Sequence, residues 1–204
     1  MNYGPFTIAI VLITVLISIP AMNDERLVNK LILWPSRMTS PKEYYRLLSS
    51  GFIHADWAHL FFNMFTMFFI GTSIEHVFSV ISTPWLYMLL YLSGIVAASI
   101  PSFLKNRNNP YYKALGASGG VSAVLFSFVY FAPWEKIYIY FFKLPSIVFA
   151  VIYLGYSVYM SRKGTDNIGH DAHFFGAVYG LIFTFIADPS HGQMFLYQIT
   201  HPKF

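Results

Sequence analysis

Residues 57–78 read WAHLFFNMFTMFFIGTSIEHVF and carry a single charged residue, Glu75. An apolar stretch of about 20 residues is long enough to cross the hydrocarbon core of a bilayer as a helix. A segment inside a bilayer must satisfy its own backbone hydrogen bonds, which favours a helix over an open strand. The stretch therefore predicts a transmembrane helix that begins near Trp57.

Similar apolar stretches recur along the chain, separated by short polar clusters. The whole sequence is 56% hydrophobic and only 11% charged, whereas soluble domains carry roughly 25% charged residues. These features predict an all-α polytopic membrane protein, a six-transmembrane-helix bundle forming one domain over residues 1–204. The expected helices span 5–22, 57–78, 85–104, 115–132, 137–160 and 170–187, and a surface loop spans 23–56.

The composition also limits the chemistry. The chain has no cysteine, which excludes disulfides, thiolate nucleophiles and cysteine-based metal sites. The formal net charge is +4. In a chain lying mostly in lipid, such a small charge favours contact with the anionic headgroups of the bilayer and not with nucleic acid.

Polar residues inside spanning helices are costly and call for an explanation. His59 and Asn63 lie four residues apart on one face near the start of the second helix. Ser118 opens the fourth helix, and His173 opens the sixth. Successive spans alternate in direction, so these three helices begin on the same side of the membrane. The four side chains are thus expected at a similar shallow depth.

Pairs of small residues let helix backbones approach closely in lipid. Gly116 and Gly120 form one such pair and Gly176 and Gly180 another. Packing of the fourth helix on the sixth would bring Ser118 toward His173. Serine is a weak nucleophile that needs an adjacent base, and a neutral imidazole can serve as that base.

A serine nucleophile also needs donors for the oxyanion of its tetrahedral intermediate. The amide of Ser118 lies near a helix N-terminus, while His59 and Asn63 offer side-chain donors from the second helix. A third, acidic member is missing. Glu75 is 16 residues beyond His59, about 24 Å along a helix, and Asp171 is two residues from His173 and points elsewhere. The pattern predicts a Ser–His dyad.

These motifs together resemble the rhomboid family over essentially the whole chain. The residues that carry the resemblance are the run from His54 to Asn63, the run from Gly116 to Gly119, and Ala172-His173 followed by Gly176 and Gly180. Arg46 and Glu75 also stand where rhomboids keep a loop arginine and a helix-two glutamate.

The resemblance implies a serine endopeptidase that cleaves transmembrane protein substrates without a cofactor or metal. Ser118 and His173 would be catalytic, and His59, Asn63 and the Ser118 amide would form the oxyanion hole. Structural support is expected from Arg46, His54, Glu75, Gly116, Gly119, Gly176 and Gly180. One departure stands out: many rhomboids carry an aromatic residue four positions after the serine, packed on the catalytic histidine, and here that residue is Ser122.

Other interpretations remain open. Ser118 taken alone is typical of close helix packing, and His59 with Asn63 is compatible with hydrogen bonds that only join helices. A rhomboid-like pseudoprotease would bind transmembrane clients without cleavage, although such proteins usually lack the serine or the histidine. A metal site at His170 and His173 lacks carboxylate ligands. A transporter or channel would need charges near mid-membrane or broken helices in two similar halves.

The resemblance implies a bacterial inner membrane location with the active site opening to the outer side. The loop charges oppose this orientation, because most Lys and Arg residues fall in the loops that it places outside, whereas cytoplasmic loops normally carry the excess.

Overall fold

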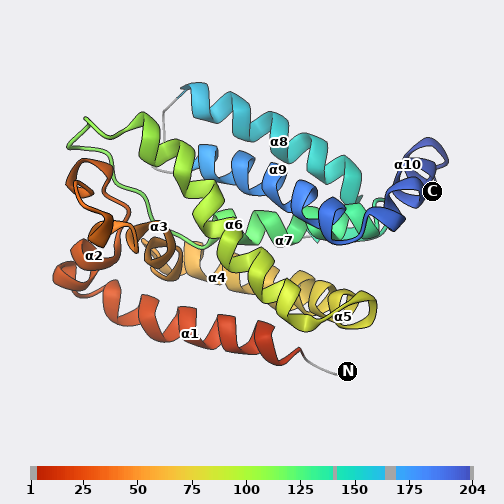
Figure 1. Ribbon diagram of the computed structural model, residues 1–204, viewed down its shortest axis with the longest axis horizontal. Coiled ribbons are helices and arrows are strands. Elements are labelled where there is room, and N and C mark those ends of the chain that lie inside the picture. The colour runs from red at the N-terminus through yellow and green to blue at the C-terminus, as the bar shows by residue number, and fades with distance from the viewer. Residues whose placement is uncertain (1–3, 140–141, 164–168, 203–204) are drawn as a thin grey trace.

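The computed structural model describes residues 4–139, 142–163 and 169–202, and most of these residues are helical. Most of the long helices lie roughly along one direction in a single bundle, and α6 (Pro84–Lys105) crosses them obliquely (Figure 1). Their bounds are α1 Pro5–Ala21, α4 Trp57–Thr66, α5 Thr72–Ile81, α6 Pro84–Lys105, α7 Ser118–Phe131, α8 Ser146–Lys163 and α9 His170–Ala187. A π-helical turn, Met67–Gly71, joins α4 to α5, so that residues 57–81 form one continuous helical segment.

By length and composition, two helical segments of the described chain can cross a membrane. They are Trp57–Ile81, with 25 residues, and Pro84–Lys105, with 22. The count rises to three spans if α9 and the C-terminal helical segment Pro189–Thr200, which meet at 100°, form one bent span. With 14 residues, α7 would extend only about 21 Å, less than the roughly 30 Å of a bilayer core. The predominantly helical class is confirmed, whereas the count of six spans stays a prediction.

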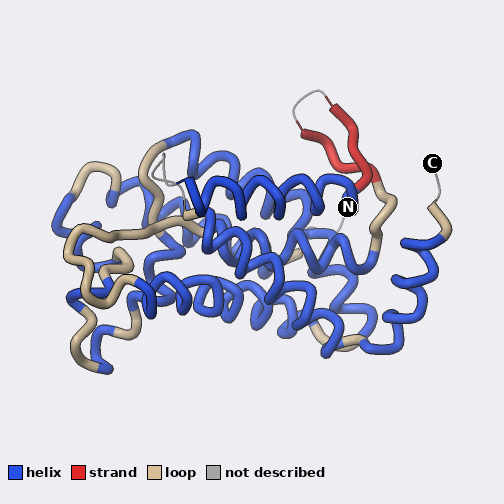
Figure 2. The backbone as a smooth tube through the Cα atoms, turned by 90° about the horizontal axis from the view of Figure 1, so that it is seen from above, coloured by secondary structure: helices blue, strands red, loops and turns tan. Residues whose placement is uncertain are grey.

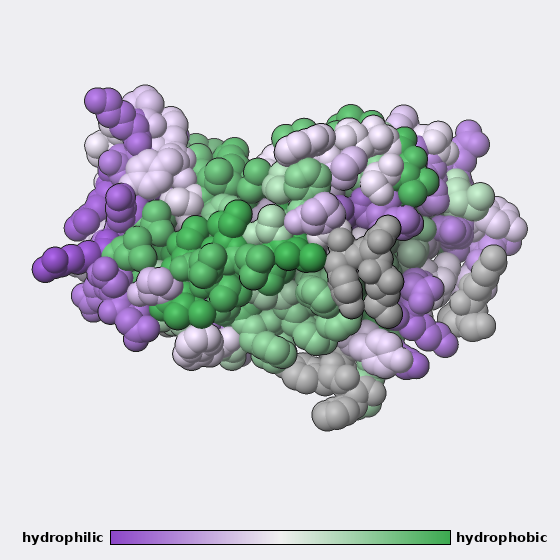
Figure 3. All heavy atoms as spheres, turned by 90° about the horizontal axis from the view of Figure 1, so that it is seen from below, coloured by the Kyte–Doolittle hydropathy of each residue, from purple (hydrophilic) through white to green (hydrophobic). Residues whose placement is uncertain are grey.

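A hydrophobic band crosses the middle of one face of the bundle. Figure 3, which views the molecule from the side of α1, shows apolar side chains gathered between two more polar ends. Exposed members of the band include Leu16 of α1, Phe61 and Phe69 of the 57–81 segment, and Leu89 of α6. Large apolar surfaces of this kind mark contact with a membrane or a partner, and here they fit the lipid-facing surface expected of a membrane helix bundle.

The predicted helix over 137–160 is wrong at its start. Residues Lys136–Ile139 and Phe142–Pro145 form β1 and β2, an antiparallel hairpin that projects from the bundle (Figure 2). Isoleucine and tyrosine alternate over 137–140, and β-branched and aromatic residues favour strands. Helix α8 therefore begins only at Ser146, whose hydroxyl donates a hydrogen bond to the carbonyl oxygen of Ala132.

The predicted surface loop 23–56 contains short helices, and a further short helix follows α9. In the loop, α2 spans Glu25–Leu31 and α3 spans Arg46–Ser49, with 3₁₀ turns at Pro35–Arg37, Pro41–Glu43 and Ser50–Phe52. After α9, a 3₁₀ turn at Pro189–His191 leads into α10, Gly192–Thr200. Asp188 and Pro189 end α9, because proline lacks the N–H that would continue the helix.

Helix α7 occupies the centre of the bundle, where it contacts both α6 and α9. Figure 1 shows that α4, α7 and α9 all begin at the end of the molecule formed by α2, α3 and their loops. Residues predicted near the starts of three separate helices are thereby gathered at one end.

Candidate active site

Ser118 is the first residue of α7 and is half-buried. The helix was predicted to begin near residue 115, but residues 114–117 are not helical. Leu33 and Ala114 form a β-bridge, and Gly116 has a φ of 118°, a left-handed conformation that only glycine adopts readily. The Ser118 amide is consequently one of the first amides of α7, which have no acceptor within the helix.

His59 lies directly against the chain that leads into Ser118. A Cβ atom on Gly116 would stand 2.6 Å from Cε1 and 2.8 Å from Nε2 of the His59 ring. Glycine at this position therefore makes the approach of the imidazole possible. His59 is held by the start of α4, where its backbone N–H donates to the Asp56 carboxylate at 2.8 Å.

Asn63 lies one turn further along α4 and is buried. Its Nδ2 donates a hydrogen bond of 2.9 Å to the carbonyl oxygen of His59. Because a primary amide has two N–H donors, this bond uses one and orients the other. His59 and Asn63 are four residues apart and share one face of α4, as their spacing predicts.

His54 connects three segments at the same end of the bundle. Its Nε2 accepts from the amide of Ala117 at 3.3 Å, and its Nδ1 lies 2.9 Å from the Ser18 hydroxyl of α1. Nδ1 must carry the proton because Nε2 is an acceptor, and Ser18 in turn donates to the carbonyl oxygen of Phe52. Burial, followed by the nearby His59, lowers the pKa of His54 to about 3, so the ring is neutral at physiological pH.

Glycine contacts join α7 to α9. A Cβ atom on Gly176 would lie 2.3 Å from the carbonyl oxygen of Gly119, and one on Gly180 would lie 2.2 Å from that of Ala123. The two helices run in parallel, since both begin at the loop end (Figure 1). In this register, His173 and Ser118 are offset by only two residues, about 3 Å along the helix axes. The glycine spacing thus places the two helix starts side by side.

The ring of His173 is flanked by two other rings. Tyr153 of α8 is stacked on it, with centroids 5.6 Å apart and an interplanar angle of 21°, and His170 meets it edge-on at 5.6 Å. The Tyr153 hydroxyl shares a hydrogen bond of 2.7 Å with Ser122 of α7. An aromatic ring therefore does pack on His173, but it comes from α8 and not from position 122.

Asp171 is directed away from the two predicted catalytic residues. One carboxylate oxygen hydrogen-bonds the Ser161 hydroxyl of α8, and the other lies 3.5 Å from Lys105 Nζ of α6. Asp171 therefore joins the ends of three helices. Within the described segments, no group of three or more His, Asp or Glu side chains is arranged to hold a metal ion.

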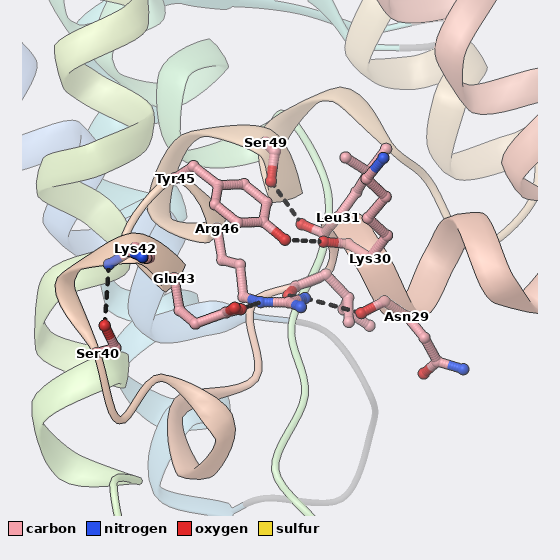
Figure 4. Close-up of polar contacts among 10 residues, drawn as sticks. Asn29, Lys30, Leu31, Ser40, Lys42, Glu43, Tyr45, Arg46 and Ser49 are labelled. Carbon is pink, nitrogen blue, oxygen red and sulfur yellow. Dashed lines mark hydrogen bonds and ion pairs between the residues drawn. The ribbon is translucent and has the colours of Figure 1, made fainter.

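Arg46 lies at the centre of a cluster of polar contacts within the loop 23–56 (Figure 4). Its Nε contacts the Glu43 carboxylate at 2.6 Å, and the guanidinium donates to the carbonyl oxygens of Asn29 and Ile32 at 2.8 and 3.1 Å. In the same cluster, Tyr45 and Ser49 donate to the carbonyl oxygens of Lys30 and Leu31. The last carbonyls of α2 are thereby satisfied by side chains from residues 45–49.

Glu75 lies at the opposite end of the bundle and is buried. Its carboxylate accepts from the amides of Phe6 and Thr7 at 3.0 and 2.7 Å and from the Thr7 hydroxyl at 2.7 Å. These amides belong to the first turn of α1, where a negative charge is favoured by the helix dipole. A Cβ atom on Gly4 would overlap this carboxylate, which explains the glycine.

A model of the Rhomboid domain matches residues 41–189. The chain belongs to the rhomboid family. The matched segment contains every predicted site residue, from Arg46 to Gly180. Membership of this family, together with the apolar helices, identifies an integral membrane protein.

Curated rhomboid relatives are 27–30% identical to this chain over the matched segments. It is 28% identical over 158 residues to Rhomboid protease GlpG of Haemophilus influenzae, covering 76% of each protein. It is 30% identical over 138 residues to Rhomboid protease GluP of Bacillus subtilis and 27% identical over 154 residues to RHOMBOID-like protein 12, mitochondrial, of Arabidopsis thaliana. These matches span only 25% of GluP and 45% of the mitochondrial protein.

Tyr153 is the residue of this rhomboid site that the sequence did not reveal. Five tyrosines fall within residues 137–160, and nothing in their spacing distinguishes the one that reaches His173. The one hint in the sequence is that position 122 lacks the aromatic residue that rhomboids pack on the catalytic histidine. An aromatic neighbour for His173 therefore had to come from another position.

Proposed function

We propose that this rhomboid is an intramembrane serine endopeptidase with a Ser118–His173 dyad. The observation that supports the proposal most is the glycine contact between α7 and α9, since it aligns the helix starts that carry the two residues. Names of two relatives state protease activity, which agrees with this chemistry.

In the proposed reaction, Ser118 Oγ attacks the carbonyl carbon of the scissile bond while His173 accepts the hydroxyl proton. The tetrahedral intermediate collapses, the C–N bond breaks, and His173 returns the proton to the leaving amine. Water then attacks the acyl ester with His173 again as base, which releases the new carboxyl end and restores Ser118. The reaction requires no acidic residue beside the Ser–His dyad. The Asp171 carboxylate already accepts a hydrogen bond from Ser161 and pairs with Lys105.

Three donors are proposed for the oxyanion. The Ser118 amide belongs to the first turn of α7, where the helix dipole favours negative charge. His59 lies against Gly116, two residues before Ser118, and Asn63 has a second N–H beyond the one bonded to His59. Donors fixed before the reaction stabilise the transition state without reorganisation, and loss of one such donor typically costs about 100-fold in kcat.

The proposed substrates are transmembrane proteins, cleaved in or near their spanning segments. The hydrophobic band of the bundle fits an enzyme that meets its substrates in the bilayer (Figure 3). A helical substrate must unwind locally, because its amides are shielded from attack, so helix-destabilising residues are expected near the cleavage site. We propose α8 and the loop before α9 as the gate, although residues 164–168 of that loop lie outside the described residues. The proposed setting is a bacterial inner membrane with the site opening outward.

The test compares wild type with Ser118→Ala and His173→Ala on single-span substrates in liposomes. Wild type should cut, and both variants should lose at least about 1,000-fold in kcat while keeping the wild-type unfolding temperature. His201→Ala is the matched histidine control, since His201 is exposed beyond α10, and should leave cleavage unchanged. Cleavage by Ser118→Ala would refute the site, whereas binding of substrates without cleavage by wild type would favour a pseudoprotease.

A further inference from the structure

The contact between Tyr153 and His173 joins a peripheral helix to the proposed dyad. Helix α8 buries only Ser146, Ala150 and Ser157, and much of its surface is exposed. At Tyr153 it reaches inward, and the phenol ring lies nearly parallel to the imidazole of His173. This is therefore the point at which α8 contacts the chemistry proposed above.

The Tyr153 ring is aimed by groups on both sides. Its hydroxyl hydrogen-bonds Ser122, which is fully buried in α7. Phe126 of α7 and Phe149 of α8 meet the ring with centroids 6.1 and 5.4 Å away. A serine at position 122 is small enough to leave room for the tyrosine and polar enough to hold its hydroxyl.

We propose that Tyr153 is a positioning residue for His173, held in place by Ser122. The proposal rests on the proposed protease function and adds that the orientation of His173 depends on the seating of α8 against α7. When α8 is docked against α7, the stacked ring of Tyr153 occupies one side of the imidazole of His173. The imidazole is thereby kept turned toward α7. When α8 moves away, the imidazole loses that support because the ring moves with it.

The proposal predicts a loss in kcat with little change in KM. Tyr153→Leu removes the ring and should lower kcat about tenfold or more, since small misplacements of catalytic groups are costly. Tyr153→Phe keeps the ring and loses the bond to Ser122, so about a threefold loss is expected, as for a single neutral hydrogen bond. Ser122→Ala should show the same loss, and the double variant should lose no more than either single variant.

The experiment measures kcat and KM on a single-span substrate in liposomes, together with the rate at which a small fluorophosphonate labels Ser118. Labelling depends on the activation of Ser118 by His173 but does not require a substrate helix to enter past α8. If Tyr153 positions His173, the labelling rate should therefore fall in parallel with kcat. Tyr159→Leu is the matched control, because this tyrosine of α8 is exposed beside Lys163, and it should retain wild-type rates.

Labelling at the wild-type rate in Tyr153→Leu would overturn the proposal, since the tyrosine would then act only on substrate entry or folding. Additive losses from Tyr153→Phe and Ser122→Ala would overturn it too, and this pair decides the question if Tyr153→Leu does not fold. Failure of the protease function itself is separate, because wild type would then neither cut the substrate nor react with the probe.

Discussion

Helices α7 and α8 are neighbours in the bundle but are held in different ways. Eleven of the fourteen residues of α7 are buried, whereas α8 buries three of eighteen. Helix α7 meets α9 through glycines, so that a Cβ at the contact would overlap backbone atoms. Helix α8 is attached through side chains such as Tyr153. The proposed nucleophile, Ser118, therefore lies on a helix with little room to move. Tyr153, whose ring packs on the proposed base His173, lies on a helix that is more easily displaced.

The largest expected effect sharpens this contrast with one substitution at the contact between α7 and α9 and one on α8. Gly180→Ala places a methyl group 2.2 Å from the Ala123 carbonyl oxygen, so the unfolding free energy should fall by about 2–3 kcal/mol. Gly155→Ala of α8 meets nothing within 4 Å and should gain up to about 1 kcal/mol from helix propensity. Reversible unfolding in detergent measures both. Equal effects would mean that α7 is no more tightly packed than α8.

A second prediction concerns His54, which holds the segment in front of α7. Its folded-state pKa, near 3, is below the ordinary value of 6.5, so the unfolded chain binds the extra proton first as the pH falls. His54 therefore contributes stability above pH 6.5 that is lost as the pH drops toward 3, by up to about 1.4 kcal/mol per pH unit.

Unfolding free energies between pH 7 and 5 test this prediction. His54→Asn should be less stable at pH 7 and should have a shallower pH dependence, whereas His201→Asn, at an exposed position, should keep the wild-type slope. An unchanged slope in His54→Asn would assign the pH dependence to other groups.

Gly116→Ala tests the left-handed turn before α7. Alanine at a φ of 118° is strained, and its methyl group would displace the His59 ring. We expect a stability loss of about 1–2 kcal/mol and, under the proposed mechanism, a loss of about tenfold or more in kcat. Gly169→Ala, before α9, has a negative φ and an ordinary contact of 3.7 Å, and should cost little in either assay.

The smallest effect is expected at the ion pair between Lys105 and Asp171. Lys105 is largely exposed and the separation is 3.5 Å, and exposed pairs contribute about 0–1 kcal/mol, less at high salt. Lys105→Met should therefore change the unfolding temperature slightly at low salt and not at high salt. A large, salt-independent loss would indicate that the contact among α6, α8 and α9 is tighter than its exposure implies.

Some elements of the fold follow directly from local sequence. The helix expected over 170–187 coincides with α9, because Gly169 and Pro189 bound a continuous apolar stretch. The start of α7 was misplaced by three residues, since Leu115 and Ala117 are as compatible with a helix as with the turn that Gly116 adopts. The hairpin was missed because a short apolar run such as 136–145 is ambiguous between strand and helix.

The sequence by itself determined a helical membrane protein of the rhomboid kind and the candidate residues on α4, α7 and α9. Apolar length and helical periodicity are local properties, and the parity of the spans then assigns those residues to one end. Only the tertiary structure decided that Tyr153 stacks on His173, that His54 ties α1 to Ala117, and that Glu75 meets the first turn of α1. These contacts join residues 20 to 69 positions apart, and their geometry depends on how whole helices pack, which no local pattern specifies.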